Sequence, residues 1–205
     1  MLTILKLSIY ALLIQLVVSD VYMPVFVAYS GNKQSVYNAW VRPSRECDIP
    51  ALLRQTRRRN HIRSHFIDQW TGVKVVKVEL FNNNRRVMWI RFDGRGSNNI
   101  NWFSNERLLS SSFNDLGRWS TFNYFSLFGE TRYTSLDRKF FINRSYAGCA
   151  KDVGWFCIAD RYQGCKWEKR GPTPSFIYTK NYTPRNYNQD SRTADTMIIS
   201  VQLKL

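Results

Sequence analysis

The sequence is poor in acidic residues and in histidine, and both shortages limit the chemistry that it can support. Lys and Arg number 30 against 15 Asp and Glu in 205 residues, so the formal net charge is +15. The carboxylates are scattered, and nothing in their spacing indicates the facing pair that glycoside hydrolysis needs. No Gly-x-Ser-x-Gly motif occurs, and Gly94-Arg95-Gly96 is typical of a turn and not of a phosphate loop. We therefore expect neither an enzyme nor a cofactor.

The two histidines, His61 and His65, are the only candidates for an acid–base pair of imidazoles. A basic secreted hydrolase such as a ribonuclease needs such a pair. At positions i and i+4 the two rings would share one helix face, whereas the enzyme needs them on opposite sides of the scissile phosphate. A hydrolase is therefore the third of our functional hypotheses.

Long apolar runs are also missing beyond the first residues. Residues 1–19 have the layout of a signal peptide, with an apolar run from Leu7 to Val18 and a small residue before the expected cleavage at Asp20. That run is too short for a comfortable bilayer span. The later apolar stretch from Val73 to Phe81 is broken by two lysines and a glutamate. We expect a secreted, extracellular protein without a membrane span.

Cysteines are few, and their spacing is too wide for a zinc knuckle. The four are Cys47, Cys149, Cys157 and Cys165. An even number in a secreted chain indicates two disulfides, with three possible connectivities. Because at most two of the three C-terminal cysteines can pair among themselves, we expect one bridge to join Cys47 to that half. We expect no metal site.

Alternating residues predict a hairpin in the middle of the chain. The stretch from Val76 to Leu80 places every second side chain on one apolar face, and the stretch from Met88 to Phe92 does the same. Asn82-Asn83-Asn84 lies between them, and Asn tolerates the left-handed conformations of tight turns. The pattern predicts two antiparallel strands joined by this turn.

Further strands and one helix complete the predicted fold. The strands are expected at Val21–Tyr29, Phe122–Phe128, Lys139–Asn143, Gly154–Asp160, Ser175–Lys180 and Thr196–Leu205. Short turn-rich connections favour a mainly β fold, an antiparallel β-sandwich like a jelly roll, stabilised by disulfides. Asp48 as N-cap and Pro50 in the first turn predict a short N-terminal helix through Leu53. The polar stretch from Lys180 to Thr193 is expected to be an exposed loop.

The expected organisation has three parts. After the leader at residues 1–19 come an N-terminal strand and an Arg-rich helical segment at residues 20–70, and then the sandwich at residues 71–205. No internal repeat stands out. At this length, residues 20–205 are expected to form one domain with a single core.

Arginines cluster in one short segment. The residues concerned are Arg54, Arg57, Arg58, Arg59 and Arg63. Guanidinium groups match phosphate, sulfate and carboxylate oxygens in bidentate geometry, which predicts an anion-binding patch. A cleavage site for a secretory-pathway protease and a solvated helix face are the alternatives. As partner we expect an acidic polysaccharide or an acidic matrix protein, and not nucleic acid.

Aromatic residues make up 15% of the chain, and several tryptophans adjoin loops rich in Asn, Ser and Gly. The residues are Trp102, Trp119, Trp155 and Trp167. Aromatic faces stack on sugars and Asn side chains bind hydroxyls, so a lectin-like recognition or defence protein is our second hypothesis, with a glycan as partner. The alternative is that these tryptophans fill the core.

Two sequons are present in the C-terminal half. They are Asn143-Arg144-Ser145 and Asn181-Tyr182-Thr183, the second weakened by Pro184. In a secreted protein both predict glycosylated asparagines, at Asn143 and Asn181, on exposed surface.

A set of short runs extends along the C-terminal part of the chain: Phe92-Asp93-Gly94, Asn101-Trp102-Phe103-Ser104, Tyr124-Phe125-Ser126-Leu127-Phe128-Gly129, Tyr146-Ala147-Gly148-Cys149, Asp152-Val153-Gly154-Trp155, Cys165-Lys166-Trp167-Glu168 and Ala194-Asp195-Thr196-Met197. In these runs, residues 73–205 resemble a secreted domain of invertebrate, especially molluscan, proteins. The resemblance implies an extracellular setting, such as the organic matrix of a mineralised shell, and implies no site residues. Our first hypothesis is accordingly a non-enzymatic, basic extracellular matrix protein that binds anionic polymers.

Overall fold

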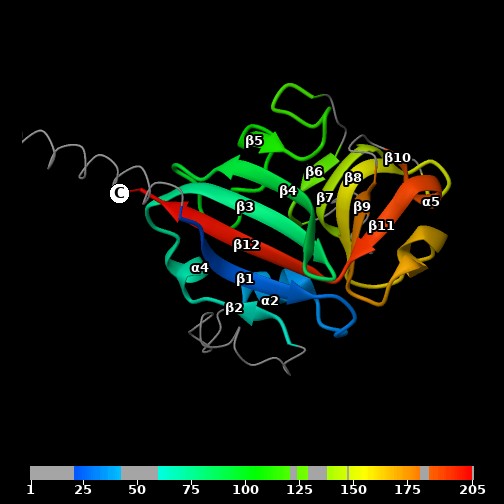
Figure 1. Ribbon diagram of the computed structural model, residues 1–205, viewed down its shortest axis with the longest axis horizontal. Coiled ribbons are helices and arrows are strands. Elements are labelled where there is room, and N and C mark those ends of the chain that lie inside the picture. The colour runs from blue at the N-terminus through cyan, green and yellow to red at the C-terminus, as the bar shows by residue number, and fades with distance from the viewer. Residues whose placement is uncertain are drawn as a thin grey trace, which may run out of the picture.

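Two antiparallel sheets dominate the computed structural model (Figure 1). The structure describes residues 21–42, 60–120, 124–128, 138–146, 148–180 and 185–204. The first sheet has the order β2 (Ile62–Arg63), β1 (Met23–Tyr29), β12 (Thr196–Leu203), β3 (Val73–Asn82), β4 (Arg85–Asp93) and β5 (Leu108–Ser111). The second has the order β11 (Ser191–Ala194), β9 (Ser175–Thr179), β8 (Val153–Ala159), β7 (Arg138–Ser145) and β6 (Tyr124–Ser126), with β10 (Arg185–Asn186) paired to β8. The predicted mainly β, antiparallel fold is confirmed.

The predicted hairpin is present as β3 and β4. Asn82 pairs with Arg85, which leaves Asn83 and Asn84 as a two-residue turn. Both have positive φ, at 48° and 61°, as a turn that matches the twist of the strands requires. The alternate residues from Val76 to Leu80 and from Met88 to Phe92 are all buried. Their apolar faces therefore form one wall of the core.

The main hydrophobic core is shared by the two sheets. Val78 of β3, Ile90 of β4 and Ile199 of β12 belong to the same buried cluster as Phe140 of β7 and Phe156 of β8. Short segments close its ends: α2 (Val36–Val41) contributes Trp40, and α4 (Phe66–Gln69) contributes Ile67. On the strands, these buried side chains come from alternate positions, because successive side chains of a strand point to opposite faces of the sheet.

The second sheet is also covered on its other side. η1 (Lys166–Arg170) lies against β9 and β11, and α5 (Tyr187–Asp190) lies against η1. Beneath them a smaller cluster contains Cys157, Trp167 and Tyr187. We call η1, β10, α5 and β11 the outer cover: η1 and α5 pack on the face of the second sheet that turns away from the main core, and β10 and β11 pair with β8 and β9 beside them.

A buried ionic network holds the outer cover to the sheet. Arg138 of β7 donates from Nε to Glu168 Oε1 at 2.8 Å, from Nη1 to Asp152 Oδ2 at 3.3 Å and from Nη1 to Tyr146 Oη at 2.5 Å. Its Nη2 lies 2.8 Å from Cys165 Sγ. Although burial by itself would lower the pKa of Arg138, the charge of Glu168 raises that pKa above its ordinary value. The guanidinium therefore stays charged and pairs with two buried carboxylates.

Gly154 shows how tightly the outer cover fits the sheet. A Cβ atom at this position would lie 2.1 Å from Asn143 Oδ1 and 2.3 Å from the Tyr187 hydroxyl. Tyr187 donates its hydroxyl proton to Asn143 Oδ1 at 2.6 Å directly over this glycine. Only a residue without a side chain leaves room for that hydrogen bond.

One expectation from the sequence is wrong, and another lies outside the described residues. The stretch from Lys180 to Thr193 is not an exposed loop: its described part forms β10, α5 and most of β11, and Tyr187 is fully buried. The segment shows no periodic pattern of apolar residues, because it buries a single aromatic ring and pairs with the sheet through its backbone. The helix expected from Asp48 to Leu53 lies outside the described residues.

The cysteines follow the prediction only in part. Cys149 and Cys165 form a disulfide with a Cα–Cα distance of 5.0 Å. Cys157 is a buried free thiol whose pKa is raised by burial to about 12, so the second predicted bridge is not formed through it. Cys47, which we expected to be bridged to one of the three C-terminal cysteines, lies outside the described residues.

Candidate functional site

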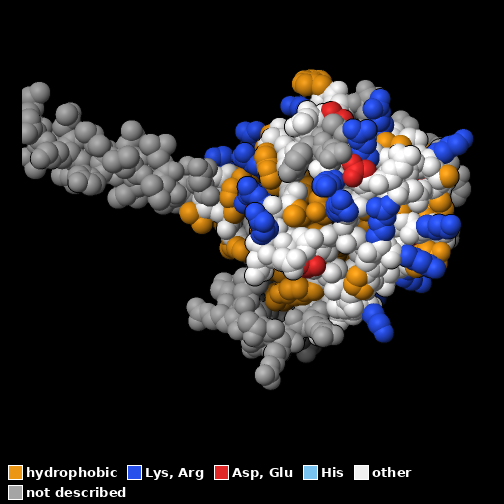
Figure 2. All heavy atoms as spheres, turned by 45° about the vertical axis from the view of Figure 1, so that its right-hand side comes forward, with side chains coloured by type: hydrophobic (Ala, Val, Ile, Leu, Met, Phe, Trp, Pro, Cys, Tyr) orange, Lys and Arg blue, Asp and Glu red, His pale blue; other side chains and the backbone are white. Residues whose placement is uncertain are grey.

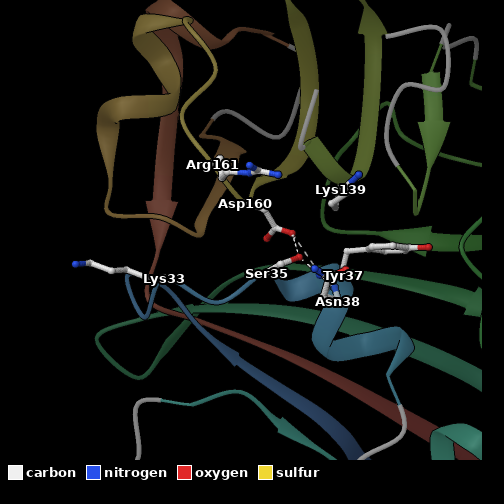
Figure 3. Close-up of a pocket in the computed structure, with 7 residues that line it drawn as sticks. All are labelled: Lys33, Ser35, Tyr37, Asn38, Lys139, Asp160 and Arg161. Carbon is white, nitrogen blue, oxygen red and sulfur yellow. Dashed lines mark hydrogen bonds between the residues drawn. The ribbon is translucent and has the colours of Figure 1, made fainter. Parts of the chain in front are cut away.

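The candidate site is a hollow lined by three cationic side chains, which we call the cationic hollow. It has a volume of about 450 Å³ and lies where the turn after β1 and the start of α2 meet the ends of β7 and β8 (Figure 3). Its lining residues are Lys33, Ser35, Tyr37, Asn38, Lys139, Asp160 and Arg161. Residues more than 100 positions apart in the sequence therefore come together in the fold to form it.

Asp160 lies at the centre of the cationic hollow and is itself buried. Its carboxylate accepts hydrogen bonds from Ser35 Oγ at 2.5 Å, from Val36 N at 2.9 Å and from Tyr37 N at 3.4 Å. Ser35 is also the N-cap of α2, and its Oγ accepts from Asn38 N at 3.1 Å. Asp160, the one carboxylate among the described lining residues, thus holds α2 against the end of β8.

Two of the three cationic side chains lie beside this carboxylate. Lys139 donates from Nζ to the Phe128 carbonyl oxygen at 3.0 Å and lies 5.3 Å from the centre of the Tyr37 ring. Figure 3 shows Arg161 and Lys139 on either side of Asp160, and Lys33 directed away from it. Three cationic side chains and one carboxylate among the described lining residues give the hollow a net positive charge, which attracts anions. The described lining contains neither histidine nor cysteine.

Charge is distributed unevenly over the whole described molecule. Among the described acidic residues only four side chains are exposed: Asp68, Glu106, Asp115 and Asp195. Asp152, Asp160 and Glu168 are buried, and Glu79 accepts from Arg86 at 2.9 Å and from Lys77 at 3.0 Å. Burial and pairing of these carboxylates therefore reduce the negative charge on the described surface, which is more basic than the composition indicates.

The outer cover carries many of the exposed cations. They are Lys166, Lys169, Arg170, Arg185 and Arg192, which lie on η1, β10 and β11. Figure 2, which turns this side toward the viewer, shows Lys and Arg side chains spread over the face and few Asp or Glu side chains. Lys169 lies 4.1 Å from the centre of the Tyr162 ring. This face presents a broad positive field in addition to the cationic hollow.

A second hollow is lined mainly by aromatic and small polar residues, and we call it the aromatic hollow. It has a volume of about 420 Å³. Its lining residues are Ile100, Asn101, Phe103, Ser104, Glu106, Arg107, Phe125, Ser126, Leu127 and Phe128. Phe103 and Phe125 pack against each other, with ring centroids 4.9 Å apart, and both contact Phe92 of the main core. The aromatic surface is therefore fixed by the core beneath it.

The arginine cluster expected to bind anions divides between two situations. Arg54, Arg57, Arg58 and Arg59 lie outside the described residues. Arg63 is buried, and it donates from Nη1 and Nη2 to the two Asp68 oxygens at 2.7 and 2.5 Å and from Nε to the Trp40 carbonyl oxygen at 2.7 Å. Its guanidinium therefore fastens β2 to the helices and is turned inward instead of toward an external anion.

The two histidines have separate environments. His61 is buried: its Nδ1 lies 3.2 Å from Tyr29 N and 3.1 Å from Asn32 Nδ2, and its Nε2 lies 3.0 Å from the Gln34 carbonyl oxygen. An imidazole that donates from Nε2 and accepts at Nδ1 satisfies all three contacts, and burial lowers the pKa of His61. His65 is exposed at the start of α4. His61 is thus engaged within the fold on both ring nitrogens.

The sequons and tryptophans are placed differently from what the sequence indicated. Asn143 is buried and bound to Tyr187, so it does not mark exposed surface; its glycosylation stays a prediction. Asn181 lies outside the described residues. Trp102, Trp155 and Trp167 are buried, as the core alternative predicts, whereas Trp119 is 90% exposed.

The cationic hollow was not found from the sequence. Lys33, Lys139 and Arg161 are isolated along the chain, and each is an ordinary surface cation in its own segment. Asp160 was noted only as one of the scattered carboxylates. No local pattern connects these residues, because their proximity depends on the pairing of β7 with β8 and on the packing of α2.

Searches for metal sites, membrane spans and relatives give no assignment. Within the part of the chain that the structure describes, no group of three His, Cys, Asp or Glu side chains could hold a metal ion. In the same residues no helix combines the length and apolar character needed to cross a bilayer. No protein-family model matches the chain, and neither curated proteins nor solved structures provide a match.

Proposed function

We propose that this protein is a secreted, non-enzymatic binder of anionic polymers and a component of an extracellular organic matrix. The observation that carries the proposal is the separation of charge among the described residues: several acidic side chains are buried or paired and only four are exposed, whereas most lysines and arginines remain on the surface. A repeating anionic polymer can contact many such cations at once, which single small anions cannot. The cationic hollow supplies one deeper contact within that surface.

The scaffold is consistent with export. The Cys149–Cys165 disulfide is of the kind that persists outside the cell, and the leader predicted at residues 1–19 would direct the chain there. Two sheets that share one core also fit the predicted β-sandwich, an architecture that many cell-surface domains use. A mineralised matrix is the setting that the resemblance to molluscan proteins implies.

The proposal is tested by measuring the binding of the purified chain to immobilised heparin and to polygalacturonate as NaCl is raised. We expect binding at low salt that weakens steeply toward about 0.5 M NaCl, because surface charges are screened over shorter distances as salt increases. Salt-independent binding, or no binding to either polymer, would remove the basis of the proposal.

Two sets of variants locate the contacts. Replacing Arg54, Arg57, Arg58 and Arg59 by Gln tests the arginine cluster, and Lys166→Gln with Lys169→Gln and Arg192→Gln tests the outer cover. Each set is expected to reduce the salt dependence of binding, because fewer cations contact the polymer. As a matched control, Glu106→Gln with Asp195→Asn removes exposed acids and should leave binding equal or stronger.

A further inference from the structure

The outward face of the first sheet carries a row of polar side chains that crosses its strands. The row consists of Ser200 on β12, Lys77 on β3, Arg91 on β4 and Ser110 on β5, each paired with the next (Figure 1). The two neighbours of Arg91 along β4 belong to the main core, so Arg91 faces away from it, because successive side chains of a strand point to opposite faces. Two cationic residues, Lys77 and Arg91, are therefore direct cross-strand neighbours.

Arg91 is the member of this row that lacks a partner among the described residues. Like charges directly opposite each other destabilise a strand pair. Lys77 is compensated, since its Nζ lies 3.0 Å from Glu79 Oε2 and 4.1 Å from the centre of the Tyr22 ring. No described acid forms an ion pair with Arg91, and its Nε is buried without a hydrogen-bond partner. Because buried donors are rarely left unpaired, this guanidinium is suited to an anion from outside the chain.

The two acids of β3 and β4 are both engaged by other cations. Glu79 is buried, and it accepts from Arg86 Nη1 at 2.9 Å in addition to its contact with Lys77. Asp93 accepts from Arg95 Nε and from Arg95 Nη2, both at 2.9 Å. The carboxylate that lies in this face is thus enclosed by two cations and is not an exposed negative charge. The outward face of the two strands carries a net positive charge, which attracts anions.

Trp89 places an aromatic ring on the same face. It lies two positions before Arg91 on β4, pairs with Glu79 and is half-buried, whereas Met88 and Ile90 on either side of it point into the core. Residues two apart on a strand are about 7 Å apart, which is the scale of one sugar ring with its substituent. The C–H face of a pyranose packs on an aromatic ring. An acidic peptide or polyphosphate would use the guanidinium but has no ring for the indole.

We propose that the outward face of β3 and β4 is a subsite for an acidic polysaccharide. One sugar ring packs on Trp89, and a carboxylate or sulfate of the polymer binds the guanidinium of Arg91 beside Lys77. An anion at this place also offsets the repulsion between the two paired cations. The inference rests on the proposed function and makes it more specific, because it names the face that binds and the class of polymer that it recognises.

The test compares two polyanions on the same protein by isothermal titration. A hexamer of galacturonic acid measures binding that depends on rings and charge, and polyglutamate at equal carboxylate concentration measures binding by charge alone. Trp89→Leu removes the aromatic face, so it is expected to weaken hexamer binding about fivefold and to change polyglutamate binding less than about twofold. Arg91→Met is expected to weaken hexamer binding about tenfold, and Arg91→Lys, which keeps the charge but loses the planar fork, to restore it only in part.

A matched pair of controls lies in the loop after β5. Arg118 and Trp119 are both exposed, with the guanidinium carbon 5.7 Å from the centre of the ring. Asp115 of the same loop accepts from Trp155 Nε1 at 2.9 Å, which holds the loop to the second sheet. Arg118→Met and Trp119→Leu should therefore bind the hexamer like the unmodified chain. Circular dichroism and the melting temperature establish that each variant is folded.

The outcomes separate the inference from the proposed function. If neither polyanion binds the unmodified chain, the proposed function fails. If polyglutamate binds and the hexamer does not, or if the variants at Trp89 and Arg91 bind the hexamer like their controls, the subsite is wrong while binding by charge remains. An equal loss of both polyanions in Trp89→Leu would also overturn recognition of the ring. Weaker hexamer binding in Trp89→Leu and Arg91→Met, with polyglutamate retained by Trp89→Leu, supports the subsite.

Discussion

The two faces of the second sheet are buried by different means. Toward the main core, Phe140, Phe156 and Phe176 meet apolar side chains of the first sheet. Toward the outer cover, Arg138 and Glu168 form an ion pair among aromatic rings. The first face is stabilised by removing apolar surface from water, and the second depends on a few polar partners that must all be present. The comparison predicts that replacing a single polar residue lowers the stability of the protein most on the outer side.

The largest expected effect is at Arg138. Arg138→Met leaves Glu168 and Asp152 buried without their counter-charge, which costs about 3–5 kcal/mol of unfolding free energy. Urea denaturation of the variant measures it. Arg192→Ala, at an exposed arginine on β11, is the control and should change stability by less than about 0.5 kcal/mol. If the two variants were equally stable, the outer cover would not depend on its ionic network.

The next largest effect concerns the disulfide of the outer side. Cys149 and Cys165 are 16 residues apart, and replacing both by Ser is expected to destabilise the protein by about 3 kcal/mol in the loop-entropy model. The unmodified protein with and without reductant provides an independent measurement of the same change. Cys157 should stay unreactive toward a thiol reagent until the protein unfolds, because it is buried and its pKa is about 12. Rapid labelling of folded, oxidised protein would contradict this placement.

The smallest expected effect is the pH dependence of stability that arises from His61, at the edge of the first sheet. Burial lowers the pKa of His61 from 6.5, so the unfolded chain takes up a proton more readily than the folded protein does. Stability is therefore fully present above about pH 6.5 and falls as the pH is lowered below that value. Denaturation midpoints of the unmodified chain and of His61→Gln, measured between pH 7.5 and 5.5, should differ in slope. His65→Gln, at an exposed histidine, should keep the slope of the unmodified chain, and an unchanged slope in His61→Gln would overturn the assignment.

The first sheet could be predicted far better than the outer cover. The hairpin and the last strand follow from alternation, because Val76, Val78, Met197 and Ile199 each report the buried face without reference to a distant partner. The network of Arg138 could not be predicted, because its acids lie 14 and 30 residues away and each, taken alone, is typical of exposed surface. The exposure expected of Asn143 was wrong for the same reason: a sequon is a local pattern, while the burial of its asparagine depends on Tyr187.

By itself the sequence determined the mainly β class, the antiparallel hairpin and the basic character, since these depend on residue alternation, turn residues and composition. Only the tertiary structure decided which charges remain outside. It buried Asp152, Asp160 and Glu168, turned Arg63 inward, and brought Lys139 and Arg161 to one hollow beside Phe128. The physical reason is that burial and pairing of a charged group depend on partners supplied by other strands, and no local pattern of residues specifies them.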